Sequence, residues 1–359
     1  MFLASLTVAT CAADTTAKGR ILPSVAVRFA DPATEFTVLR LTDPKFASLL
    51  PAIGNRGVTA RQLLYASDLA GKWQAFRMDL KSRESRQLTE AENLDAASIA
   101  LLPNERGFSH FDGPSLVQTS FSALKTRVVY RVPEGFEKVP GASYSDDGRY
   151  AAFVEKGGSS YRLRLVHTPR GSAATLLESS EELSDPLLRP RDASLIYRNK
   201  GEWWSVQFGG KQNRRLPLAQ GEALQAQWTD DGHALEYLNR PAESGKLTAL
   251  REWTTGAGAE QGGDVKIADT SQFVSFHANA DASVYVGASG SKGSPYLLLL
   301  SRASRRELAL AEHRASDPAR VTPTFAPNSQ FVLFVSDRHG KPAIYWISVD
   351  KLVAETDGS

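Results

Sequence analysis

The chain has 359 residues, of which 42% are hydrophobic, and its 42 basic and 40 acidic side chains leave a formal net charge of +2. This balance excludes a global electrostatic preference for nucleic acid or for an acidic membrane surface. We expect no transmembrane span, and the single cysteine excludes an internal disulfide. The length suits one large repeat domain.

The N-terminus is apolar and then turns polar. Residues 1–13 resemble the back half of a secretory signal, although they lack the basic start of one. The order Val8-Ala9-Thr10-Cys11 also resembles a bacterial lipobox with an unusual threonine. We therefore expect residues 1–20 to be a signal or N-terminal tail, and the protein to be periplasmic or secreted. The lipobox-like order would place a lipid anchor on Cys11. A plain apolar tail, and with it a cytoplasmic location, stays open as the alternative.

Seven short polar turns recur along the chain at intervals of roughly forty to fifty residues, and each is followed by a run of β-forming apolar residues. A repeat of this length with several strands per unit is typical of β-propeller blades. The turns lie near Asn55-Arg56-Gly57, Asn104-Glu105-Arg106-Gly107, Asp146-Asp147-Gly148, Arg191-Asp192-Ala193, Asp230-Asp231-Gly232, Ala280-Asp281-Ala282 and Pro327-Asn328-Ser329.

The order of strands within one unit is clearest between Leu63 and Thr89, where three strands alternate with turns. The same order returns between Phe334 and Ile347. Helical periodicity is sparse. The sequence therefore predicts an all-β fold, a seven-bladed propeller of four-stranded antiparallel blades, over residues 36–350, with a C-terminal tail at 351–359.

The last blade reaches Val349-Asp350 without an outer strand that resembles Arg86-Gln87-Leu88-Thr89. A matching strand stands at the other end of the chain, in Thr37-Val38-Leu39-Arg40-Leu41-Thr42. We expect Phe36 to Asp43 to pair onto the last blade, which would close the ring and remove an exposed edge. An independent N-terminal strand is the alternative.

Several of these segments resemble the oligogalacturonate lyases, a family of TolB-like propellers. The likeness runs from about residue 36 to 350 and rests on signatures at both ends and in the middle of the chain. These are Arg40-Leu41-Thr42-Asp43, Leu63 to Asp68, Met78-Asp79-Leu80, Arg86-Gln87-Leu88-Thr89, Val129 to Gly135, Pro323 to Asn328 and Ile344-Tyr345. The resemblance implies an enzyme that cleaves short pectin fragments by β-elimination with bound manganese.

In this chemistry a base removes the uronate C5 proton while a metal or an arginine neutralises the adjacent carboxylate. The resemblance implies four metal ligands and one histidine base, and this chain departs at nearly all of them. The two late histidines fall on Arg320 and Thr322, the glutamine ligand on Asp317, and the base on Gln225, so that only His277 matches. We therefore expect the manganese site to be mostly lost and no other cofactor to replace it.

His277 has three readings: a residual ligand with Asp317, a catalytic proton-transfer group, or a hydrogen-bonded polar residue in the mouth of the ring. Arg320 could bind a uronate carboxylate in place of the metal, with Gln225 and Thr322 beside it, or it could pair with Asp317. Two other histidines, His110 and His339, stand in predicted surface turns.

Two functions follow. The first is a lyase-like propeller that binds pectin-derived uronate oligosaccharides, with or without cleaving them. The alternative is a non-catalytic TolB-like module that binds an envelope protein. In both cases we expect a monomer, and the expected partner is either an acidic oligosaccharide or that envelope protein.

Overall fold

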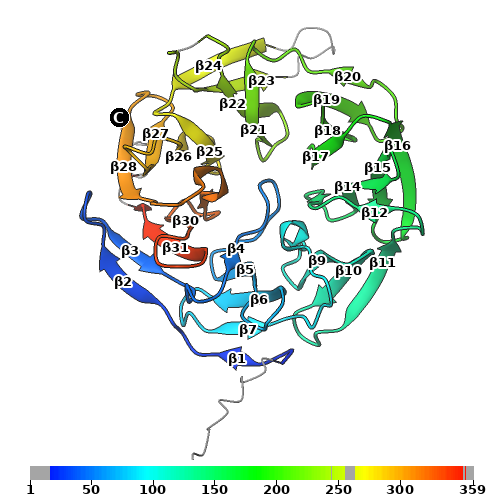
Figure 1. Ribbon diagram of the computed structural model, residues 1–359, viewed down its shortest axis with the longest axis horizontal. Helices are drawn as coiled ribbons and strands as arrows, with labels where there is room; N and C mark the ends of the chain where they lie inside the picture. Colours follow the sequence, from blue (N-terminus) through cyan, green and yellow to red (C-terminus); the bar gives the residue numbers. More distant parts are fainter. Residues whose placement is uncertain (1–16, 244, 255–262, 351, 353–359) are drawn as a thin grey trace, which may run out of the picture.

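A computed structural model describes residues 17–243, 245–254, 263–350 and 352. These residues form seven antiparallel sheets arranged as blades around a central axis, which confirms the predicted seven-bladed propeller (Figure 1). Two three-residue 3-10 helices, η1 (Ala96–Ser98) and η2 (Pro318–Arg320), are the other regular elements of the described part. No helix there has the length and apolar composition needed to cross a bilayer.

The strands of the first three blades are given from the axis outward. Blade 1 contains β4 (Ser48–Leu49), β5 (Gln62–Ser67), β6 (Gln74–Asp79), β7 (Ser85–Gln87) and β1 (Ile21–Leu22). Blade 2 contains β8 (Ala100–Leu101), β9 (Gly107–Asp112), β10 (Ser115–Ser120) and β11 (Thr126–Arg131). Blade 3 contains β12 (Glu137–Lys138) and β13 (Ser143–Tyr144), then β14 (Tyr150–Gly157), β15 (Ser160–His167) and β16 (Ser172–Ser179).

The next three blades have four strands each. Blade 4 contains β17 (Leu183–Leu188), β18 (Ser194–Asn199), β19 (Glu202–Gln207) and β20 (Arg214–Arg215). Blade 5 contains β21 (Glu222–Trp228), β22 (Ala234–Arg240), β23 (Ala249–Thr254) and β24 (Gly263–Asp269). Blade 6 contains β25 (Phe273–Ala278), β26 (Val284–Ser289), β27 (Tyr296–Ser301) and β28 (Glu307–Glu312).

The last blade is completed by the N-terminal part of the chain, as predicted. It contains β29 (Thr324–Phe325), β30 (Phe331–Ser336), β31 (Ala343–Ser348), β3 (Thr37–Arg40) and β2 (Val27–Ala30). Val38 lies opposite Ile347, and Arg40 opposite Tyr345. The chain before residue 36 adds strands that the sequence did not predict, because β2 extends blade 7 and β1 extends blade 1.

The turns between the two inner strands of blades 3 and 5 share one geometry. In blade 5 the hydroxyl of Thr229 donates to Asp231 and accepts the backbone N–H of Ala234. Gly232 completes this turn with a φ of 69°. Glycine adopts this left-handed conformation without a side-chain clash, which is why the Asp-Gly pairs mark the repeat so clearly in the sequence.

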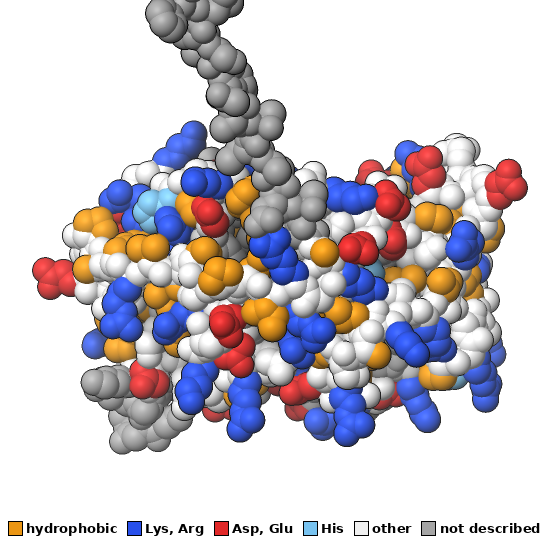
Figure 2. Space-filling view, turned by 90° about the horizontal axis from the view of Figure 1, so that it is seen from below, with side chains coloured by type: hydrophobic (Ala, Val, Ile, Leu, Met, Phe, Trp, Pro, Cys, Tyr) orange, Lys and Arg blue, Asp and Glu red, His pale blue; other side chains and the backbone are white. Residues whose placement is uncertain are grey.

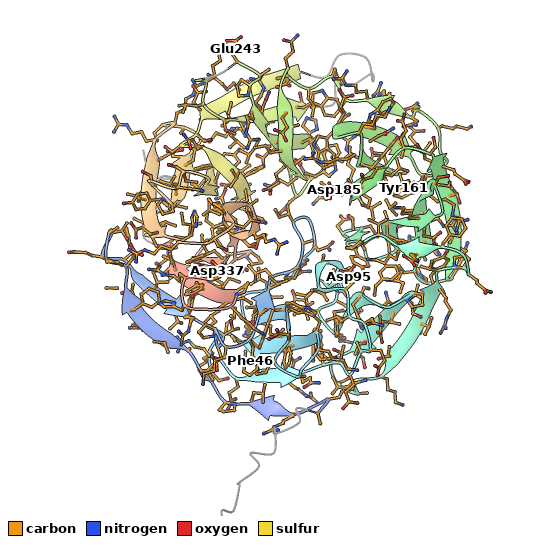
Figure 3. All side chains as sticks on the ribbon, in the orientation of Figure 1. Phe46, Asp95, Tyr161, Asp185, Glu243 and Asp337 are labelled. Atoms are coloured by element: carbon orange, nitrogen blue, oxygen red, sulfur yellow. The ribbon has the colours of Figure 1, made fainter. Side chains whose placement is uncertain are left out.

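The core is divided among the spaces between neighbouring blades. One cluster joins blade 7 to blade 1, with Leu41, Leu63, Tyr65, Leu333 and Ile344 all buried. Figure 3 shows side chains filling the spaces between blades all around the ring, with Asp95 and Asp185 nearer to the axis and Glu243 on the outer rim. The ring is therefore held together blade by blade, and its axis is left for other contacts.

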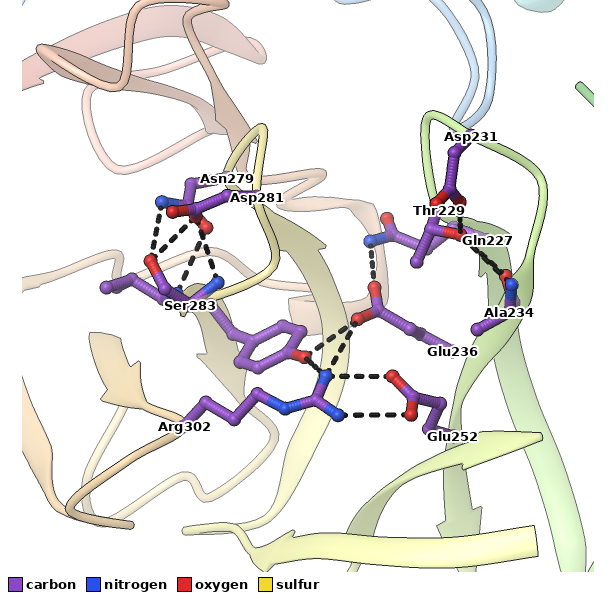
Figure 4. A network of polar contacts seen from close by, with 12 residues as sticks. Gln227, Thr229, Asp231, Ala234, Glu236, Glu252, Asn279, Asp281, Ser283 and Arg302 are labelled. Carbon is purple, nitrogen blue, oxygen red and sulfur yellow. Dashed lines mark hydrogen bonds and ion pairs between the residues drawn. The ribbon is translucent and has the colours of Figure 1, made fainter. Parts of the chain in front are cut away.

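A buried carboxylate adds a polar link between blades 5 and 6 (Figure 4). Glu236 is fully buried and accepts hydrogen bonds from the Tyr285 hydroxyl at 2.7 Å and from Gln227 Nε2 at 3.1 Å. Arg302 binds the neighbouring Glu252 through two bonds of 2.8 and 3.0 Å. Burial raises the pKa of Glu236, and the hydrogen bonds from Tyr285 and Gln227 oppose that rise.

Candidate functional site at the axis

The inner strands are interrupted partway along their length, so that short excursions leave the sheets near the axis. In blades 4, 5 and 6 the interruption is a bulge, at residues 185–186, 224–225 and 274. Blade 2 places η1 at this level and blade 7 places η2 there. Bulges re-aim side chains away from a ladder, so these excursions determine which groups face the axis.

The longest reach across the axis comes from blade 1. Residues 50–57, here called the axial segment, leave β4 and return to the sheet where Val58 pairs with Leu63. Figure 1 shows this loop entering the centre of the ring. Asn55 Nδ2 donates to the carbonyl of Ala142 in blade 3 at 2.8 Å, and Gly54 lies against Leu187 of blade 4. The axial segment therefore spans the opening and is held on its far side.

His277 lies on β25 of blade 6 and lines a small cavity against the axial segment. Thr324, Leu333 and Asn55 line the same cavity, whose volume is about 20 Å³. Such a space holds about one water molecule. A sugar ring therefore cannot reach His277 from this side unless the axial segment moves.

The imidazole of His277 is tuned toward its neutral form. Burial lowers its pKa, while a hydrogen bond to the Ala278 backbone and the charge of Asp230 oppose that change. Its Nδ1 accepts the backbone N–H of Phe325 at 3.4 Å. Of the three readings, the hydrogen-bonded polar residue is the one for which the structure gives direct contacts.

Gln225 lies beside His277 but its side chain is already used. Its Nε2 donates to the carbonyl of Phe276 at 2.7 Å, and its Oε1 accepts the N–H of the same residue at 2.9 Å. Both bonds join the bulge of β21 to the inner edge of β25. An amide has no basic lone pair at neutral pH, so Gln225 works here as a link between blades 5 and 6.

Arg320 ends η2, the excursion of blade 7 that lies against β25. Its side chain is 83% exposed and its Nε lies 3.5 Å from Asp317 Oδ2. Asp317 also caps η2, because its Oδ1 accepts the N–H of Ala319. The pairing of Arg320 with Asp317 that the sequence left open is therefore present, and neither residue lines the cavity of His277.

Thr322 follows with a φ of 42°, a left-handed conformation that β-branched residues rarely adopt. Strained backbone of this kind gathers at functional sites. The Thr322 carbonyl accepts a bond from the Thr324 hydroxyl at 3.2 Å. The structure thus brings His277 and Gln225 together, whereas Arg320 and Thr322 occupy the neighbouring excursion.

One buried charged pair near the axis was not predicted from the sequence. Lys138 of blade 3 pairs with Asp95 of blade 2, and both side chains are largely buried. Burial lowers the pKa of Lys138, and the charge of Asp95 opposes this. No motif marks the pair, since the two residues are 43 positions apart and stand in unremarkable turns.

The sequence placed His110 and His339 in surface turns, and the structure agrees for one of them. His339 lies exposed in a turn, as predicted, and its Nδ1 is 2.8 Å from the Tyr345 hydroxyl. The surface placement of His110 is wrong, because this residue lies on β9 with 2% of its surface exposed. Its ring stacks on Phe108, which lies two residues earlier on the same strand and therefore on the same face of the sheet.

Manganese would find few ligands at the positions that the resemblance implies. Among the described residues, no group of three or more His, Cys, Asp or Glu side chains is placed to hold a metal ion. His277 supplies one imidazole, whose Nδ1 already accepts a backbone N–H, and Arg320 brings a positive charge. The donor set present therefore does not fit a manganese ion, which takes several oxygen or imidazole ligands.

Comparison with known proteins gives one consistent result, although no family model matches the chain. A curated oligogalacturonide lyase of Pectobacterium atrosepticum is 25% identical over 93% of this chain and 98% of its own length. An oligogalacturonate lyase of Dickeya dadantii is 23% identical over the same shares.

Solved structures agree on the fold. An oligogalacturonate lyase in complex with manganese superposes with a TM-score of 0.85 at 22% identity, covering 93% of this chain and 98% of its own. The oligogalacturonate lyase of Vibrio parahaemolyticus gives a TM-score of 0.84 at 22% identity, covering 93% and 99%. The protein is therefore similar to oligogalacturonate lyases in sequence over nearly the whole of both chains, and it shares the fold of the two solved lyases.

Proposed function

We propose that this protein binds uronate oligosaccharides at the axial end of the ring through Arg320, and that elimination through a bound metal is weak or lost. The similarity to oligogalacturonate lyases supports an acidic oligosaccharide as the ligand class. The change of mechanism is supported by Asp317, Arg320 and Thr322, which stand where the resemblance implies metal ligands.

One observation carries the proposal. Arg320 presents a largely exposed guanidinium on the excursion that lies against the strand of His277. Its partner Asp317 is 56% exposed, and exposed ion pairs of this kind contribute little free energy. A uronate carboxylate can therefore replace Asp317 as the partner of Arg320 with two parallel hydrogen bonds.

Full catalysis would need more than this contact. In β-elimination a base takes the C5 proton, the C5–H electrons form the C4–C5 double bond, and the C4–O bond breaks with its electrons on the leaving oxygen, which then takes a proton. Arg320 could stabilise the carboxylate during proton removal. The base is the missing part, because Gln225 stands at its position and is bonded to Phe276.

The direct test measures binding and cleavage separately on the whole protein. Calorimetry with trigalacturonate should show binding in the presence of a chelator, and the ultraviolet absorbance of the unsaturated product should rise slowly or not at all, with or without added manganese. Rapid formation of unsaturated product would contradict the proposed weakening or loss of metal-dependent elimination. Absence of binding to di-, tri- and tetragalacturonate would favour the module that binds an envelope protein.

A further inference from the structure

A second cavity lies away from the axis, at the seam where blade 7 meets blade 1. It has a volume of about 170 Å³, compared with about 20 Å³ beside His277. The segment between β1 and β2 runs over this seam along the rim of the ring (Figure 1). Leu22 of β1 and Val25 of that segment line the cavity, as do Leu69 and Met78 of blade 1.

Most of the wall is apolar, and the hydroxyl groups in it are satisfied within the protein. Tyr65 donates to Ser85 at 2.9 Å, Ser48 donates to Ser67 at 3.2 Å, and Thr42 accepts the N–H of Ile344. An apolar cavity of about 150 Å³ is large enough for one benzene ring. The body of a ligand here would therefore be one aromatic ring or a short alkyl chain.

Arg83 gives the cavity a charged end. It lines the cavity, and its guanidinium lies 5.8 Å from the Trp346 ring of blade 7. Its Nε is buried and makes no hydrogen bond among the described residues. A buried donor without an acceptor costs free energy, and a carboxylate is the acceptor that matches a guanidinium best.

One acidic group also borders the cavity. The Oδ1 of Asp43 accepts the N–H of Lys45, and the negative charge of Asp43 would repel an anion placed beside it. Phe46, which lies at blade 1 in Figure 3, adds a ring to the wall. A ligand would therefore place its carboxylate toward Arg83 and its ring toward Phe46 and Met78.

We propose that the seam cavity binds a small aromatic or short-chain carboxylate, with the carboxylate on Arg83 and the apolar body among Leu22, Phe46 and Met78. Its walls come from blade 1 and from the two segments that connect blade 1 with blade 7, so an occupant would lie across the seam that closes the ring. Binding would stabilise that closure and raise the thermal midpoint. The site is separate from the axis and does not depend on sugar binding.

The rim that contains the seam mixes apolar side chains with Lys and Arg (Figure 2). Val25, at the mouth of the cavity, is 46% exposed, so a larger side chain can be placed there without disturbing the core. Val128 on β11 is 53% exposed and does not line the cavity, which makes it the matched control.

The experiment titrates the full chain with phenylacetate and, separately, with the neutral isostere phenylacetamide, using calorimetry and thermal shift. We expect wild type to bind phenylacetate more tightly, Arg83→Gln to weaken phenylacetate by about tenfold while sparing phenylacetamide, and Lys81→Gln in the same turn to change neither. Val25→Trp should block both compounds, and Val128→Trp neither.

Three results would overturn the proposal. The first is equal affinity of wild type for the acid and the amide, which would remove the role of Arg83. The second is no binding of either compound. The third is binding that Val25→Trp leaves intact, which would place the ligand elsewhere. Thermal midpoints of the unliganded variants serve to confirm that each one folds.

Discussion

The side-chain amide of Gln225 makes two hydrogen bonds to the backbone of Phe276: its Nε2 donates to the Phe276 carbonyl at 2.7 Å, and its Oε1 accepts the Phe276 N–H at 2.9 Å. The inner strand of a blade has no further strand on its axial side, so the backbone groups that face the axis need other hydrogen-bond partners. Gln225 supplies both for β25, one residue before His277.

Replacing Gln225 by Ala should therefore lower stability rather than affinity. Two backbone groups would lose their partners and turn to water, and we expect the free energy of unfolding to fall by about 1 to 2 kcal/mol. Chemical denaturation measures this change. Gln225→Glu, which keeps the acceptor but loses the donor, should fall between Ala and wild type. Wild-type stability in the Ala variant would show that the link contributes nothing.

His110 should make the fold sensitive to acid. Burial lowers the pKa of His110 to about 3, from an ordinary 6.5, so the folded protein keeps the ring neutral while the unfolded chain takes a proton. Stability is then lost as pH falls from about 6.5 toward 3, by up to roughly 1.4 kcal/mol per pH unit.

Denaturation of wild type and His110→Phe between pH 7 and pH 4.5 checks this expectation. The variant should show the shallower dependence on pH. His233→Gln is the control, because that histidine is exposed at the turn of blade 5 and should leave the slope as it is. Equal slopes for His110→Phe and wild type would contradict the assignment.

The axial segment should limit access to the ring from its side. Replacing residues 52–55 by two glycines removes the bond from Asn55 to Ala142 and the contact of Gly54 with Leu187. If ligands pass this way, affinity for trigalacturonate should rise severalfold, because the small cavity beside His277 would open. Unchanged affinity, measured by calorimetry on a variant that still folds, would mean that the sugar binds wholly outside the axial segment.

Manganese should bind weakly or not at all. His277 is the one retained imidazole of the implied set, and the positive charge of Arg320 opposes a cation nearby. Metal analysis of the purified protein, followed by calorimetry with manganese, measures this. Stoichiometric binding at micromolar concentration or below would show that other residues form a site, and the His277→Ala variant would tell whether His277 takes part.

The ring could be predicted from the sequence because its determinants are local and repeated. Turns such as Thr229 to Gly232 recur with a common geometry, and the strand at Thr37 to Arg40 matches the outer strands of other blades. β1 and β2 escaped prediction because they are short, partly exposed and lie outside the repeat.

The site was harder to predict because its geometry depends on contacts between blades. The sequence left open whether Arg320 binds a carboxylate of a ligand or pairs with Asp317, and the structure shows the pair with Asp317. It could not show that the axial segment reaches Ala142 and Leu187, since these contacts join positions far apart in the chain. Nor could the sequence show that the Gln225 side chain is hydrogen-bonded to the backbone of Phe276 in the next blade.

The measurement that tests the central claim most directly is calorimetry of trigalacturonate with Arg320→Gln in the presence of a chelator. We expect about a tenfold loss of affinity, less than for a fully desolvated arginine because Arg320 is exposed and screened by water. Arg215→Gln is the matched control, since Arg215 is also an exposed arginine paired with a carboxylate, that of Glu202, on the outer strand of blade 4. The account predicts that only Arg320→Gln weakens binding while both variants keep the wild-type thermal midpoint; equal affinity of Arg320→Gln and wild type would contradict it.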